Sequence, residues 1–272
     1  MDLPLALILA AVSLAAGGNS PEVTVTGHRF ENTRAAVEAI SPNVSQTEPL
    51  ARFFGTVCVS SSGLPEEADR YIVARVEDIA AGLGLSIGKP GCQANIVILF
   101  VPDGKKAVHD LSAKGSPSLS SQSPSSIRRI LKEAGAGRGW IETEVRSRDG
   151  DRIHYKVSSA PELSLATSSQ MTLPIRRDIV SSVVIIDRDA VAGLNINRVT
   201  EYAAFRALTG VHSDGRLNGQ SIMSLFTKTA AYSPDGLTQF DKVYLKVLYN
   251  GKAGSPSAIK KSEISRNIEL VK

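Results

Sequence analysis

The spacing of apolar residues predicts alternating strands and helices from about residue 51 onward. The run FFGTVCVS at 53–60 indicates a strand, and helical spacing then continues from Ala68 to Leu83, ending at Gly82 or Gly84. The uninterrupted apolar run NIVILFV at 95–101 is typical of a strand that is covered on both faces. Strand, helix and strand in this order predict an α/β layer.

The middle of the chain is more polar. Eight of the fifteen residues from 112 to 126 are serine, which predicts a polar loop, and helical spacing returns between 127 and 134. Arg128, Arg129 and Lys132, with Arg138 beyond, form the densest basic cluster. Because no phosphate-cradling loop adjoins this cluster, we expect it to be a solvated helix face. The alternative is an anion site. Residues 140–145 and 152–157 flank Asp149-Gly150, a hairpin signal.

Helices dominate the C-terminal third. The run SVVIID at 182–187 indicates a strand, and 195–208 has helical spacing that stops at Gly210. A polar loop follows, and Thr238 with Asp241 form a capping-box pattern that opens a last helix reaching Tyr249. The predicted fold class is therefore α+β, with a mixed sheet packed with helices.

Both ends of the chain are expected to lie outside this domain. Residues 1–17 resemble a signal peptide, with an uncleaved membrane anchor as the alternative. Residues 18–50 are predicted to be an extended or disordered arm, 51–250 the α+β domain and 251–272 a C-terminal tail. Within the arm, EVTVTG at 22–27 resembles the TonB box of outer-membrane receptors, a segment that pairs as a strand with a partner.

Composition and cysteine usage place the protein in a broad class. The 272 residues are 42% hydrophobic and 21% charged with a formal net charge of +4, which fits a globular protein and does not suggest nucleic-acid binding. In an exported chain the pair Cys58 and Cys92 is most simply a disulfide; a metal site or a catalytic thiol are the alternatives. We expect a periplasmic or secreted protein without stable membrane insertion after signal cleavage.

The order of elements in the C-terminal third resembles that of metzincin-type zinc peptidases. Those enzymes have a strand, a helix with His-Glu-x-x-His, a Gly-x-x-His exit, a Ser-Ile-Met turn and a later helix ending in Leu-Tyr. The resemblance covers about 182–250, and it extends to uncharacterised secreted Gram-negative proteins with the same degenerate, zincin-like outline. Aligned in this way, Tyr202 and Arg206 stand at the first two histidines, Ala203 at the glutamate, His212 at the third histidine and Met223 at the Met-turn.

The departures from the motif determine the expected chemistry. Tyr202 and Arg206 cannot present two nitrogens to Zn²⁺, and Ala203 supplies no general base. We therefore expect no metal, no cofactor and no metal-water catalysis, and interpret the chain as a pseudo-peptidase-like binding protein. Its ligand would be a peptide or an envelope protein at Tyr202, Arg206 and His212, with Arg206 receiving an acidic group. The alternatives are a hydrolase with an unrecognised site and a passive domain that docks a partner through EVTVTG.

Overall fold

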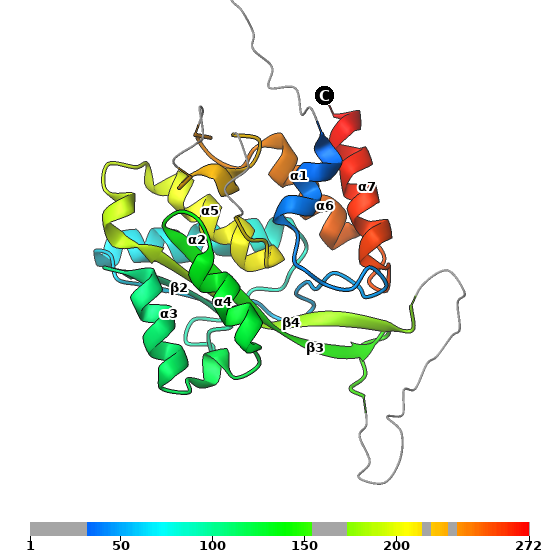
Figure 1. Ribbon diagram of the computed structural model, residues 1–272, viewed down its shortest axis with the longest axis horizontal. Helices are drawn as coiled ribbons and strands as arrows, with labels where there is room; N and C mark the ends of the chain where they lie inside the picture. The colour runs from blue at the N-terminus through cyan, green and yellow to red at the C-terminus, as the bar shows by residue number, and fades with distance from the viewer. Residues whose placement is uncertain (1–31, 154–172, 214–218, 228–232, 272) are drawn as a thin grey trace, which may run out of the picture.

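The computed structural model describes residues 32–153, 173–213, 219–227 and 233–271 (Figure 1). In chain order the helices and strands are α1 (Thr33–Ile40), β1 (Val59–Ser62), α2 (Glu66–Gly82), β2 (Ile96–Val101), α3 (Gly104–Ala113), η1 (Pro117–Leu119), α4 (Pro124–Lys132), β3 (Gly137–Ser147), β4 (Ile175–Asp187), η2 (Arg188–Val191), α5 (Ile196–Thr209), η3 (Ile222–Ser224), α6 (Gln239–Asn250) and α7 (Ser257–Leu270). The expected signal peptide and the EVTVTG segment lie outside the described residues.

A four-stranded mixed sheet forms the centre of the molecule, so the α+β prediction is confirmed. Its strand order is β1-β2-β4-β3; the first three strands are parallel, and β3 pairs antiparallel with β4 at one edge. In Figure 1 the β3–β4 ribbon extends past the helices as a long arm. The antiparallel edge strand β3 therefore adjoins both the helical body and solvent.

Helices cover both faces of the sheet. The larger core lies between one face and α1, α2, α5, α6 and α7, and it includes Ile98 and Val184. The smaller core joins α3, η1 and α4 to the other face, where the Trp140 indole nitrogen donates to the Ser118 carbonyl at 2.6 Å. Alternate residues of β2 and β4 enter the two cores, as the apolar run at 95–101 predicted.

Two segments that we expected outside the domain are helices packed on it. Helix α1 lies in the expected arm, yet Val37 and Ile40 are fully buried. Helix α7 lies in the expected C-terminal tail, and it packs against α1 and α6 through Ile264 and Ile268. The polar surroundings of both segments concealed short apolar stripes that close the larger core.

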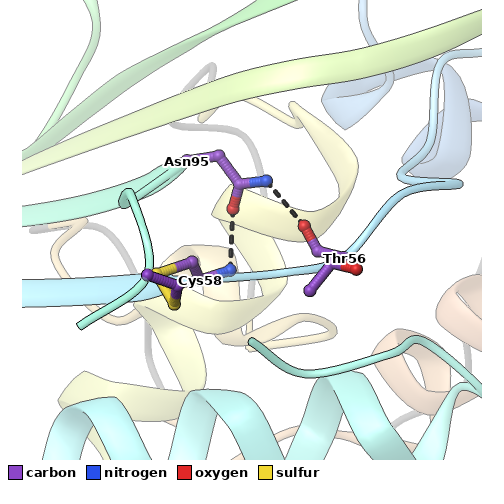
Figure 2. Close-up of a disulfide and its surroundings, with 4 residues drawn as sticks. Thr56, Cys58 and Asn95 are labelled. Atoms are coloured by element: carbon purple, nitrogen blue, oxygen red, sulfur yellow. Dashed lines mark hydrogen bonds between the residues drawn. A yellow bond between two sulfur atoms is a disulfide. The ribbon is translucent and has the colours of Figure 1, made fainter. Parts of the chain in front are cut away.

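The two cysteines form the expected disulfide. Cys58 and Cys92 are bonded across a sequence separation of 34, and no free cysteine occurs among the described residues. Beside the bridge, Asn95 accepts a hydrogen bond from the Cys58 backbone at 2.9 Å and donates to the Thr56 carbonyl at 2.8 Å (Figure 2). The bridge and Asn95 together fix the start of β1 against the start of β2.

The hairpin prediction is only partly correct. The chain turns tightly at Asp149-Gly150, where the Ser147 backbone nitrogen donates to the Asp151 carbonyl at 2.8 Å, and Arg146 and Arg152 form an isolated bridge. The long partner of β3 among the described residues, however, is β4. Residues 154–157 of the expected second strand lie outside the described residues. No helix within the described ranges is long and apolar enough to cross a membrane.

Candidate functional site: a groove along the edge strand

Helix α5 is the element on which the predicted site residues lie. It begins after Asn195, whose side chain accepts from the Asn197 backbone at 2.8 Å, and it ends at Gly210 in the left-handed conformation (φ 67°). Every residue from 199 to 209 is buried. A helix buried on all sides packs its polar residues against protein, so their partners decide what they do.

Two glycines of β3 let α5 approach the strand closely. A Cβ at Gly137 would lie 2.2 Å from the Tyr202 hydroxyl oxygen, and one at Gly139 would lie 2.7 Å from the Arg206 Nε. Real Cβ atoms do not approach other atoms so closely. The sequence Gly-x-Gly at the start of β3 therefore makes room for the side chains of Tyr202 and Arg206 on α5.

Tyr202 and Arg206 belong to a buried polar network. The Arg206 guanidinium forms an ion pair with Glu133, which follows α4, and also donates to the Tyr202 hydroxyl at 3.1 Å. The other Glu133 carboxylate oxygen accepts from the Ser213 backbone nitrogen at 2.6 Å. The ionised side chains are 1% and 4% exposed. Burial alone would lower the pKa of Arg206, but Glu133 and Tyr202 outweigh it and raise that pKa above its usual value.

This network corrects the expected role of Arg206. We predicted a guanidinium open to an acidic ligand, whereas its charge is already matched by Glu133 inside the protein. Burial is the largest influence on the pKa of Tyr202 and raises it, although the neighbouring Arg206 lowers it. Neither side chain is presented to solvent, and neither lines the groove described below.

The Met-turn-like segment is fixed by a buried carboxylate. Met223 is 1% exposed within η3, which contacts α5. Asp241 at the start of α6 accepts from the Ser221 hydroxyl, the Ile222 backbone at 2.8 Å and both the backbone and the hydroxyl of Thr238, which completes the predicted capping box. Burial raises the pKa of Asp241 to about 6, against the opposing effect of these hydrogen bonds.

Of the predicted ligand-binding residues, His212 alone reaches an open surface. It is partly exposed, and its backbone nitrogen donates to the Ile40 carbonyl at 3.0 Å. It lines a groove of about 610 Å³ that adjoins β3, α4, the segment after α1 and the segment after α5. The residues lining this edge groove are Pro42, Asn43, Val44, Ser45, Glu48, Ala51, Ser121, Gln122, Ser126, Arg129, Ile130, Lys132, Glu133, Gly139, Trp140, Ile141, Thr143, Arg177, Gly210, His212 and Ser213.

The backbone of β3 faces the edge groove at alternate residues. The Ala136 carbonyl accepts a hydrogen bond from the Asp187 backbone nitrogen, so the backbone groups of residue 136 point toward β4. Because this orientation alternates along an antiparallel strand, the backbone groups of Gly139 and Ile141 point away from β4. The Ile141 carbonyl indeed accepts from the Gln122 side chain at 3.0 Å, outside the sheet. After the bulge at 142–143, Thr143 lies opposite Ile179. The Ile179 backbone nitrogen donates to the Arg52 carbonyl and not to β3, so the backbone groups of Thr143 also face outward. The edge groove thus contains a row of outward-facing strand groups, of which the Ile141 carbonyl is already bonded to Gln122.

Sequence reasoning missed Glu133 and the edge groove. Glu133 follows a basic helix in a polar stretch, and its two partners lie 73 and 80 residues further along the chain. The local signal that existed was Gly137-x-Gly139, because glycine within a strand indicates a close approach by another group.

The described residues contain no group of three or more His, Cys, Asp and Glu side chains that could hold a metal ion. Comparison with protein-family models, curated proteins and solved structures gives no match.

Proposed function

We propose that the protein is an exported, non-catalytic binding protein of the cell envelope that holds an extended peptide along the edge of β3. The single observation that carries this proposal is the row of outward-facing backbone groups at Gly139, Ile141 and Thr143 within a groove of about 610 Å³. An extended peptide adds a strand to such an edge through main-chain hydrogen bonds, and its alternate side chains occupy the walls.

The contents of the wall support binding over hydrolysis. In the zinc-peptidase alignment, two metal-binding side chains are replaced by Tyr202 and Arg206. Both are buried and hydrogen-bonded to each other, and Arg206 also pairs with Glu133. In this pseudo-peptidase interpretation, a buried polar pair takes the place of the metal ligands. The disulfide supports export, because such bonds persist in oxidising compartments.

The edge groove also suits a chain in strand conformation by its size. Gly139 to Thr143 spans four steps of β-strand, about 13 Å at a rise of roughly 3.3 Å per residue. A peptide of about five residues would therefore lie within the groove, with one end near α4 and the other near the ion pair between Arg177 and Glu48 (2.8 Å).

The test is amide exchange on the full mature chain. We expect the peptide acetyl-Val-Thr-Val-Thr-Val-amide to slow exchange at the outward amides of Gly139 and Ile141, while the inward amide of Trp140 is unchanged. Unaltered exchange at saturating peptide, or protection elsewhere alone, would refute strand addition.

A variant pair makes the test independent of side-chain chemistry. Ile141→Pro removes the outward amide of an edge strand without removing a ladder bond, whereas Ile141→Val keeps that amide and most of the side chain. We expect at least tenfold weaker binding for the proline variant and near-normal binding for the valine variant, with both folded by circular dichroism. The same peptide incubated with the protein should stay intact by mass spectrometry, and its cleavage would favour the hydrolase alternative.

A further inference from the structure

The charges of the edge groove are unevenly compensated. Its acidic residues are both engaged, Glu48 with Arg177 at 2.8 Å and Glu133 with the buried Arg206. Arg129 and Lys132 also line the groove and are exposed, and neither forms an ion pair with another described residue. The groove therefore carries excess positive charge on α4.

This charge lies at one end of the strand edge. Arg129 and Lys132 are three residues apart, so they share a face of α4, and Lys132 directly precedes Glu133. Because Glu133 is bonded to Ser213 and to Arg206, this part of α4 is held beside the start of β3, where Gly139 meets Arg206. The other end of the groove, near Thr143, has the compensated pair of Arg177 and Glu48.

Strand polarity relates this asymmetry to the direction of a bound peptide. Strand β3 runs away from α4, from Gly137 to Ser147. A peptide added antiparallel, which is the more stable pairing per residue, would run toward α4 and place its C-terminal end beside Arg129 and Lys132. A carboxylate there would receive charge-assisted hydrogen bonds from both cations.

We infer that the edge groove selects extended peptides with a carboxylate at the C-terminal end, bound antiparallel to β3 and recognised by Arg129 and Lys132. This inference rests on the proposed function and specifies its ligand. The carboxylate comes either from a free C-terminus or from a terminal acidic side chain, and the two sources share the same recognition chemistry.

Four labelled probe peptides test the inference by fluorescence anisotropy. All carry the Val-Thr-Val-Thr-Val core; one ends in a free carboxylate, one in an amide, one in Asp-amide, and one has Asp before the core and an amide after it. We expect the free-carboxylate or the Asp-amide peptide to bind about three- to tenfold more tightly than the plain amide, with the gain reduced at high salt. Whichever of them binds more tightly identifies the source of the carboxylate.

Charge variants on the same helix provide the control. Arg129→Gln with Lys132→Gln should abolish the preference for a C-terminal carboxylate. Arg129→Gln alone should reduce that preference, whereas Arg128→Gln, which removes the same single charge outside the groove, should preserve it. Loss of preference in the Arg128 variant as well would show a general field effect and overturn site recognition. Equal affinity for the first three probes, or a gain only with N-terminal Asp, overturns the inference while the proposed function stands. Failure of the plain amide peptide to protect the Gly139 and Ile141 amides refutes the proposed function itself.

Discussion

Removing either partner of the Arg206–Glu133 pair should be among the most costly single changes in the protein. The two side chains are 1% and 4% exposed, so deleting one leaves the other as an uncompensated buried charge. Such changes cost about 3–5 kcal/mol, whereas replacing a whole buried pair with neutral groups is often close to neutral. We therefore expect about 3–5 kcal/mol for Arg206→Met and for Glu133→Gln individually.

The double variant distinguishes a buried pair from two independent residues. If the two charges depend on each other, Arg206→Met combined with Glu133→Gln should lose much less than the sum of the single losses, giving a coupling of at least about 2 kcal/mol. The assay is urea unfolding of each variant at pH 7, with the linear slope compared to confirm that the unfolded states are equivalent.

An exposed pair in the same protein serves as the control. Arg70 and Glu66 on α2 lie 2.8 Å apart with side chains 66% and 83% exposed. Arg70→Met should change the free energy of unfolding by less than about 1 kcal/mol. A cost below about 1 kcal/mol for Arg206→Met, or strictly additive single effects, would refute the closed network and reopen Arg206 as a ligand-binding cation.

Three further outcomes follow from other parts of the structure. Replacing Cys58 and Cys92 with serine should cost about 4 kcal/mol by urea unfolding, since loop closure over a separation of 34 residues reduces the entropy of the unfolded chain; a loss below 1 kcal/mol contradicts this. Burial raises the pKa of Asp241 from 3.8 to about 6. The contribution of this group to the free energy of unfolding is therefore complete below pH 4 and falls by about 3 kcal/mol as the pH rises through 6. Unfolding measured as a function of pH should show that loss in the wild type but not in Asp241→Asn, and the same pH dependence in both proteins contradicts it. Gly137→Ala should lower the melting temperature by several degrees because its methyl group meets the Tyr202 hydroxyl, and an unchanged melting temperature would show that α5 can move away.

Local signals were sufficient for elements that carry their own boundaries. Helix α2 begins after Pro65 with two glutamates in its first turn, and the start of α6 has a complete capping box, so both could be located from the sequence. Helix α7 was missed because its apolar stripe is sparse. Its Lys260 is 3% exposed and pairs with Glu263 at 2.7 Å, so a residue expected on the surface packs inside.

The candidate site was harder to predict because its determinants are far apart in sequence. The helical spacing at 195–208 correctly located α5, and His212 follows that helix. It could not show that Glu133, from a different helix, would neutralise Arg206, since nothing near either residue encodes that pairing. The edge position of β3 likewise depends on which strand pairs with β4, and the hairpin signal at Asp149-Gly150 suggested a different partner.

The closed network explains how the start of the edge groove is held in shape. Two glycines bring β3 against α5, Arg206 and Tyr202 fill the space between them, and Glu133 ties α4 and the Ser213 segment to the same point. All three walls beside the start of the strand edge are therefore held by one buried cluster. Because the groove is fixed before binding, most of the conformational entropy lost on binding comes from the peptide. Tyr202 and Arg206 are, in this arrangement, the residues that keep the edge of β3 in place.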